Sequence, residues 1–141
     1  MTSGSSIVYT NTRLTTGKTY YYKVVAYRTV NGNKVYSEFS EVVSATPVPA
    51  KPTVTLTSTS RKITVKWGKI SGASGYEVYR ATSKYGTYSL RKTVTSGSTL
   101  TYTNTGLTTG KTYYYKVRAY RTVNGVKIYG DYSSVKYIKC K

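Results

Sequence analysis

The sequence predicts an all-β fold, a two-layer sandwich of seven short strands preceded by an incomplete copy of the same unit. Three observations predict it. Apolar and polar residues alternate along short segments rich in Val, Thr and Tyr, turn residues separate these segments, and one long stretch of the chain recurs farther along. β-branched and aromatic residues favour pleated, half-buried strands. No segment shows the sustained period of a helix, so we expect no helical layer.

An internal repeat sets the domain organisation. Residues 3–45 match residues 96–138 at a constant offset of about 93, with about 29 of 43 positions identical. A period of this length suits a small domain in tandem better than a solenoid. The first copy has no counterpart of residues 53–95. The expected parts are the last three strands of one domain in residues 1–46, a Pro-rich linker in residues 47–52, and a complete domain in residues 53–141.

The strands of the complete domain follow from local patterns. Residues 63–67 alternate apolar and polar, as a strand with one buried face should. Residues 76–80 follow the turn-rich segment 71–75, and residues 88–91 begin after another glycine. Along the strand that contains Tyr113, alternate side chains fall on opposite faces of the sheet.

Hairpin turns and a core follow from the same patterns. Asn31-Gly32 and Asn124-Gly125 each lie between β-prone residues and predict type I′ turns. Residues 1–46 carry only half a core, so we expect them to be marginally stable alone and to be a fragment of a longer array. The predicted core residues of the complete domain are Val54, Leu56, Ile63, Val65, Trp67, Tyr76, Val78, Leu100, Tyr102, Leu107, Tyr113, Tyr115, Val117, Ala119 and Val135.

The composition excludes most catalytic and metal chemistry. Without a single His, the chain can form no Ser-His-Asp triad, Cys-His dyad or His-ligated metal site. The four acidic residues are too few for a carboxylate-pair enzyme. We therefore expect no catalytic residue, no cofactor and no metal. Cys140 is expected to be a free thiol, with an intermolecular disulfide as the alternative. The chain shows no apolar run of about 20 residues and no signal-peptide pattern.

The charge is strongly positive, with 22 Lys and Arg against 4 Asp and Glu, a formal net charge of +18. Such a field favours anionic partners. The adjacent basic pairs are Arg61-Lys62 and Arg91-Lys92, so no basic run marks a nucleic-acid tract. The favoured interpretation is that repulsion keeps the protein soluble and monomeric, because net charge informs association and not fold.

Three segments carry a resemblance to a known family. The first is Trp67 in the second strand, and the second is GYEVYR at residues 75–80. The third is the spaced series Leu107, Gly110, Tyr113, Tyr115, Val117 and Ala119, which recurs from Leu14 to Ala26. Together they resemble a fibronectin type III domain of bacterial surface and secreted proteins, a seven-stranded immunoglobulin-like sandwich.

The resemblance implies structural roles for four residues. Tyr113 would be the tyrosine corner, with its hydroxyl bonded to the backbone of the preceding turn, to which Leu107 and Gly110 belong. Trp67 would pack between the sheets. The family usually has proline two residues after the corner leucine, where this chain has Thr109. We expect this difference to make the turn slightly less rigid.

A row of side chains on the outer face of one sheet is the candidate ligand face. Aromatic and cationic groups on one face can stack on sugars or bases and bind phosphates. The favoured alternative is structural, because Tyr–Lys and Glu–Arg pairs across strands, here with Glu77, stabilise sheets. The residues of the candidate ligand face are Tyr79, Tyr114, Lys116, Arg118 and Tyr120.

The resemblance implies a function without catalysis. We expect a structural and adhesion spacer module of a multidomain secreted or cell-surface bacterial protein. It would be a monomer whose partners are neighbouring domains of the same polypeptide. The alternative is a module that binds an anionic polymer, such as teichoic acid, an acidic glycan or nucleic acid, through the candidate ligand face.

Overall fold

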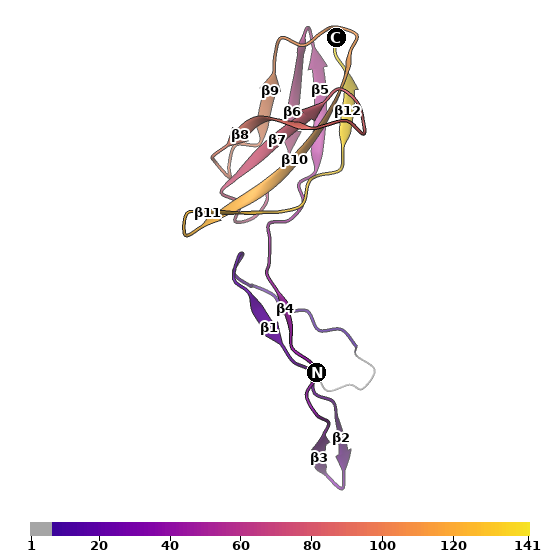
Figure 1. The fold of residues 1–141 in the computed structure, drawn as a ribbon, viewed down its shortest axis with the longest axis vertical. Helices are drawn as coiled ribbons and strands as arrows, with labels where there is room; N and C mark the ends of the chain where they lie inside the picture. The colour runs from indigo at the N-terminus through magenta and orange to yellow at the C-terminus, as the bar shows by residue number, and fades with distance from the viewer. Residues whose placement is uncertain (1–6) are drawn as a thin grey trace. The chain divides into compact units, whose positions relative to one another are not determined.

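The computed structural model describes residues 7–141, which form strands joined by turns and loops (Figure 1). Two compact units divide between Pro47 and Val48. The described residues contain no helix, and thus none that is long and apolar enough to cross a membrane. The all-β prediction is confirmed. The first six residues of the predicted segment 1–46 lie outside the described residues.

The first unit holds two antiparallel strand pairs, β1 with β4 and β2 with β3. Asn31 and Gly32 between β2 and β3 have φ values of 49° and 79°. Both lie in the left-handed region, as a type I′ turn requires, so this predicted turn is confirmed. The strands are β1 (Tyr20–Tyr22), β2 (Tyr27–Val30), β3 (Asn33–Tyr36) and β4 (Val43–Ala45).

The second unit holds two sheets that face each other. One has the order β5-β6-β9, and the other has the order β11-β10-β7-β8, with β12 also paired to β10. Asn124 and Gly125 form the second predicted type I′ turn, with φ values of 50° and 79°. The strands are β5 (Val54–Thr59), β6 (Lys62–Trp67), β7 (Gly75–Ala81), β8 (Ser89–Val94), β9 (Thr101–Asn104), β10 (Thr112–Val123), β11 (Val126–Tyr129) and β12 (Lys136–Lys139).

The last strand of the sandwich is interrupted, so this unit has eight strand segments where the sequence predicts seven. β11 pairs with the end of β10, and β12 pairs with its beginning. Between them, Ser133 N donates to Val117 O at 2.7 Å, and Val117 N donates to Ser133 Oγ at 3.0 Å. A serine side chain therefore completes the ladder where the backbone of the last strand leaves it.

The core lies between the two sheets of the second unit. The ring of Trp67 lies 5.4 Å from that of Tyr76, centroid to centroid. Val135, which the sequence places in the core, is 37% exposed because it falls in the interrupted part of the last strand. The buried members of the core are Val54, Ile63, Val65, Trp67, Tyr76, Val78, Val94, Leu107, Tyr113, Tyr115, Val117, Ala119 and Cys140.

The start of the second unit is packed, although the sequence assigns residues 47–52 to a linker. Pro49 and Pro52 are buried. The backbone of Pro49 lies against Gly130 so closely that a Cβ at position 130 would overlap it. Gly130 is thus required by a close backbone approach.

The first unit repeats the pairing of the last strands of the second unit. Tyr20 lies opposite Ala45, as Tyr113 lies opposite Ile138. Each of these pairs is related to the other by the offset of the sequence repeat. Equivalent positions of the sequence repeat therefore pair in the same register in both units.

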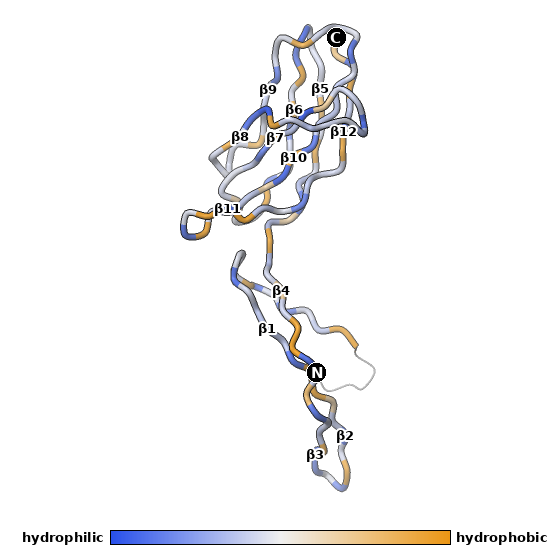
Figure 2. The backbone as a smooth tube through the Cα atoms, viewed as in Figure 1, coloured by the Kyte–Doolittle hydropathy of each residue, from blue (hydrophilic) through white to orange (hydrophobic). Residues whose placement is uncertain are grey.

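The two units differ in how far the side chains next to these paired strands are buried. Val24 is 63% exposed, whereas Val117, its counterpart, is 0% exposed. Figure 2 shows hydrophobic segments in both units, and in the first unit such residues, including Val43 at 62%, stay exposed. Residues 7–46 contain no strands equivalent to β5–β8, of which β5 and β6 belong to the sheet that faces the corresponding residues in the second unit.

Candidate binding face of the second unit

Strands β7 and β10 position the candidate ligand face. Alternation along β10 buries Tyr115 and Val117 and leaves Lys116 and Arg118 half-buried on the outer side. The register places Lys116 opposite Tyr79 and Arg118 opposite Glu77. The sheet thus brings three of the predicted face residues side by side, and two of them, Tyr79 and Arg118, contact the carboxylate of Glu77.

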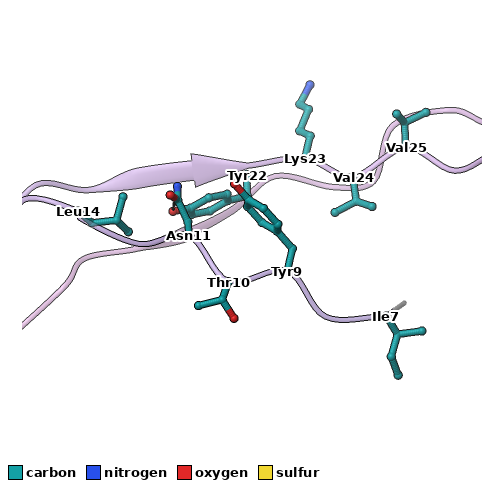
Figure 3. Close-up of a pocket in the computed structure, with 9 residues that line it drawn as sticks. All are labelled: Ile7, Tyr9, Thr10, Asn11, Leu14, Tyr22, Lys23, Val24 and Val25. Atoms are coloured by element: carbon teal, nitrogen blue, oxygen red, sulfur yellow. Dashed lines mark hydrogen bonds between the residues drawn. The ribbon is translucent and has the colours of Figure 1, made fainter. Parts of the chain in front are cut away.

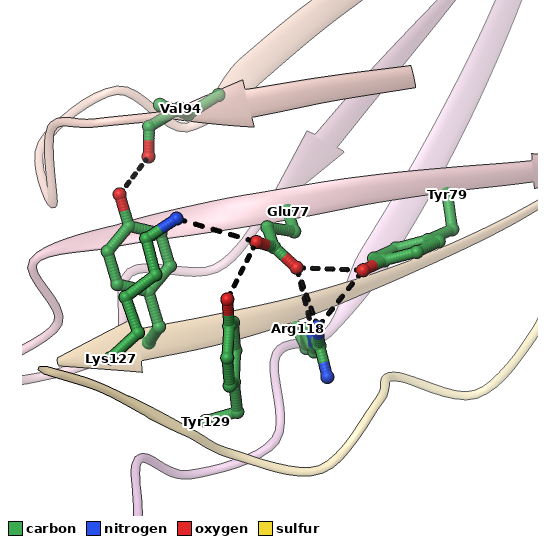
Figure 4. Close-up of polar contacts among 7 residues, drawn as sticks. Glu77, Tyr79, Val94, Arg118, Lys127 and Tyr129 are labelled. Atoms are coloured by element: carbon green, nitrogen blue, oxygen red, sulfur yellow. Dashed lines mark hydrogen bonds and ion pairs between the residues drawn. The ribbon is translucent and has the colours of Figure 1, made fainter. Parts of the chain in front are cut away.

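Glu77 is the centre of this cluster, although it is only 4% exposed (Figure 4). Arg118 donates from Nε at 3.0 Å and from Nη2 at 2.8 Å to Glu77 Oε2. The Tyr79 hydroxyl donates to the same oxygen at 2.8 Å. Tyr129 donates to Oε1 at 3.0 Å, and Lys127 Nζ lies 3.6 Å from it. Both carboxylate oxygens are therefore fully engaged.

The contacts shift the titration of these groups. Burial acts to raise the pKa of Glu77, but hydrogen bonds from Arg118, Tyr79 and Tyr129 outweigh it and lower this pKa below its ordinary value. Burial, together with the hydrogen bond to Glu77, raises the pKa of Tyr79. For Arg118, burial is outweighed by the bond to Glu77, and its pKa is raised. Glu77 is therefore held as an anion and the groups around it keep their protons.

Tyrosine rings cover the cations of this face. The Arg118 guanidinium carbon lies 3.7 Å from the ring centroid of Tyr129 and 5.0 Å from that of Tyr132. Lys116 Nζ lies 3.9 Å from the ring of Tyr132 and 4.7 Å from that of Tyr88. Cation–π contacts of this kind stabilise the sheet surface. The arrangement favours the structural interpretation of the row.

The two remaining face residues lie apart from this cluster. Tyr114 is half-buried, and its ring lies 5.5 Å from that of Tyr137. Tyr120 is 3% exposed, so its predicted exposure is wrong. Gly75 lies opposite it and has no side chain, so the ring fills that space and the hydroxyl donates to Val94 O at 3.2 Å.

Sequence reasoning missed the residues that the last strand contributes. Lys127 and Tyr129 reach Glu77 from β11, and Tyr132 follows that strand. The positions of Lys127 and Tyr129 could have been predicted from the sequence, because the two-residue turn at Asn124-Gly125 fixes the register of β11 on β10. Tyr132 lies in the interruption of the last strand, which no local pattern indicates.

The turn before β10 has the geometry of a tyrosine corner. Thr108 N donates to the Tyr113 hydroxyl at 3.1 Å, and Thr15 N donates to the Tyr20 hydroxyl at 3.0 Å in the first unit. Leu107 is 3% exposed. These bonds fix the turn against the strand that follows.

The resemblance also gives structural roles to Gly110, which lies in the turn before β10, and to Trp67, which lies in the core. Gly110 has a φ of 83°, and its N–H donates to Cys140 O at 2.8 Å. Trp67 is 5% exposed, and its Nε1 is buried without a hydrogen-bond partner among the described residues. Trp67 therefore contributes through its packing.

A hollow of about 770 Å³ lies in the first unit (Figure 3). Its lining includes Leu14, Tyr22 and Val24, the counterparts of buried core residues of the second unit. Asn11 Nδ2 donates to the Tyr22 hydroxyl at 3.2 Å, as Asn104 does to Tyr115 at 3.0 Å. No acidic residue lines the hollow. The hollow is therefore an open surface lined by the counterparts of core residues.

Residues 7–141 hold no group of three or more His, Cys, Asp or Glu that could bind a metal ion.

No family model matches the chain. Among curated proteins, exoglucanase B of Cellulomonas fimi is 32% identical over 123 residues, covering 79% of this chain and 10% of that protein. The chain therefore spans about a tenth of the length of this relative.

The chain is also similar to solved structures. An Fn3-like protein from Clostridium thermocellum is 31% identical, with 67% of this chain and 93% of that chain covered and a TM-score of 0.49. The sixth fibronectin type III domain of human fibronectin type III domain containing protein 3 is 18% identical, with 68% and 89% covered and a TM-score of 0.55, and shows the fold. The chain thus has the fold of fibronectin type III domains and is similar to them.

Proposed function

We propose that this chain is a non-catalytic structural and adhesion spacer module of a multidomain secreted or cell-surface bacterial protein. The saturation of Glu77 supports this proposal most directly. A catalytic carboxylate must exchange a proton or bind a substrate group, and this one is occupied by Arg118, two tyrosines and Lys127. The chain matches only about a tenth of the length of an exoglucanase, which is consistent with one module among several in a longer protein.

The spacer role predicts that the purified chain has no hydrolytic activity. We expect no release of sugar from cello-oligosaccharides, and a sedimentation mass near the 15.7 kDa of one chain. If sugar is released, Glu77→Gln and Asp131→Asn distinguish the source, since a contaminant enzyme is unaffected by either substitution. Activity that one of these substitutions abolishes would overturn the proposal.

We infer also that residues 7–46 are the last strands of a second sandwich. The shared register and the open hollow support this, since the opposing strands are what the second unit places over the equivalent residues. Its partners would then be neighbouring domains of the same polypeptide. Amide exchange tests it: protection of Tyr20–Ala45 should be weak beside that of Tyr113–Ile138. Equal protection would contradict it.

The alternative function, binding of an anionic polymer at the candidate ligand face, has less support. Arg118 is paired with Glu77, and Lys116 lies between two tyrosine rings. Lys116→Gln is the clean probe because it leaves Glu77 paired. Steep, salt-sensitive binding of teichoic acid that this variant loses would favour the alternative over the spacer role.

A further inference from the structure

The fold gathers basic residues at one end of the sandwich although the sequence shows no basic run. The turn between β5 and β6, the turn before β10, and the end of β12 meet at the end marked C in Figure 1. Each brings exposed cations. We call these four residues the cationic end: Arg61, Lys62, Lys111 and Lys139.

Backbone hydrogen bonds fix the three segments to one another. Arg61 N donates to Lys141 O at 2.7 Å, and Leu107 N donates to Arg61 O at 3.1 Å. Cys140 N donates to Lys111 O at 2.9 Å. Because these bonds join the first turn to both others, the four cations are held on a rigid frame and not on a loose tail.

No acidic side chain of the described residues forms an ion pair with the cationic end. The ion pairs among the described residues both involve Glu77, with Arg118 and Lys127. The second unit has seventeen basic and two acidic side chains, and like charges on neighbouring strands destabilise a sheet. The arrangement thus leaves a concentrated positive field that an outside anion can neutralise.

Arg61 occupies a backbone position that suits few residues. Its φ is 53°, in the left-handed region that favours glycine or asparagine in a two-residue turn. Its Nε donates to Leu107 O at 3.4 Å, and its terminal nitrogens have no partner among residues 7–141. The guanidinium is therefore anchored at one nitrogen and free at the two that bind phosphate in a bidentate way.

We propose that the cationic end binds a linear polymer with closely spaced phosphate groups. Four fixed cations can each release a counterion when they contact successive phosphates, which gives affinity to a polymer and little to a single ion. Residues 7–46 of the first unit have no such site, since the counterpart of Lys139 is Thr46 and these residues include no strand pair like β5–β6. This binding is independent of the spacer role.

The test uses the full chain and long inorganic polyphosphate. A triple variant, Lys62→Gln with Lys111→Gln and Lys139→Gln, keeps Arg61 and its turn. We expect it to weaken binding about tenfold at low salt and to reduce the slope of log K against log salt by about 2–3. Single phosphate should show no binding at the same concentration of phosphorus.

A matched control removes the same charge elsewhere. Lys51, Lys69 and Lys92 are exposed, and Lys69 follows the opposite end of β6. Changing these three to Gln should weaken binding less than about threefold, because they lie outside the contact. Equal weakening by both triple variants, or no binding by the wild type, would overturn the site. Amide shifts on titration should map to residues 59–62, 106–112 and 138–141.

Discussion

Arg118 lies directly opposite Glu77 on the neighbouring strand and donates two hydrogen bonds to a single oxygen of its carboxylate. Glu77 is 4% exposed, so this pair lies largely out of water. Removing one partner of such a pair is costly because the other charge stays buried. The hydrogen bonds between Arg118 and Glu77 therefore stabilise the outer face of the sheet.

The first prediction concerns that network. Arg118→Met should lower the free energy of unfolding by about 3 kcal/mol, as measured by urea denaturation with Trp67 fluorescence. Lys116→Met, on the same face but without contact to Glu77, should cost about 1 kcal/mol or less. The double variant Glu77→Leu with Arg118→Leu should recover much of the loss. A double variant as unstable as Arg118→Met would contradict the account.

The second prediction concerns pH. The pKa of Glu77 is lower in the folded chain than its ordinary value of about 4.3. Its contribution to stability is therefore present above that value and is lost as the pH falls through the folded pKa. Urea midpoints measured from pH 7 to pH 2 should fall less steeply for Glu77→Gln than for the wild type.

The third prediction concerns the tyrosine corner. Tyr113→Phe removes the acceptor of the Thr108 N–H bond and should cost about 1 kcal/mol. Tyr20→Phe makes the same change in the first unit and should leave the Trp67 unfolding transition unmoved, because it lies in a separate compact unit. A shift of equal size in both variants would show that the two units unfold together.

The fourth prediction compares one residue in its two settings. Val117 is 0% exposed, and Val24 is 63% exposed. Val117→Ala should destabilise the sandwich by about 2 kcal/mol, since it removes buried methyl groups. Val24→Ala should change the unfolding transition by less than about 0.5 kcal/mol. A large effect of Val24→Ala would mean that something covers this residue in solution.

Much of the fold could be predicted because its signals are local. The alternation in β6 and the turns at Asn31 and Asn124 depend on neighbouring residues, so the sequence displays them directly. The Glu–Arg pair across strands was also predicted, because the strands of Glu77 and Arg118 are antiparallel neighbours in the expected sandwich.

The remaining features depend on contacts that are distant in sequence. Tyr120 is buried because Gly75, 45 positions earlier, leaves room for its ring. Val135 is exposed because the last strand leaves the ladder around Ser133. The cationic end escapes a search for basic runs because two turns and one strand end, far apart in the sequence, supply its residues separately. Alternation along a single strand carries none of this information.

Cys140, a free cysteine at the end of the last strand, is 2% exposed among the core side chains. A thiol reagent can react with it only when the end of the last strand opens. The alkylation rate of Cys140 in native buffer therefore measures how often this strand end opens. Mass spectrometry of the alkylated protein can therefore follow this local opening without any denaturant.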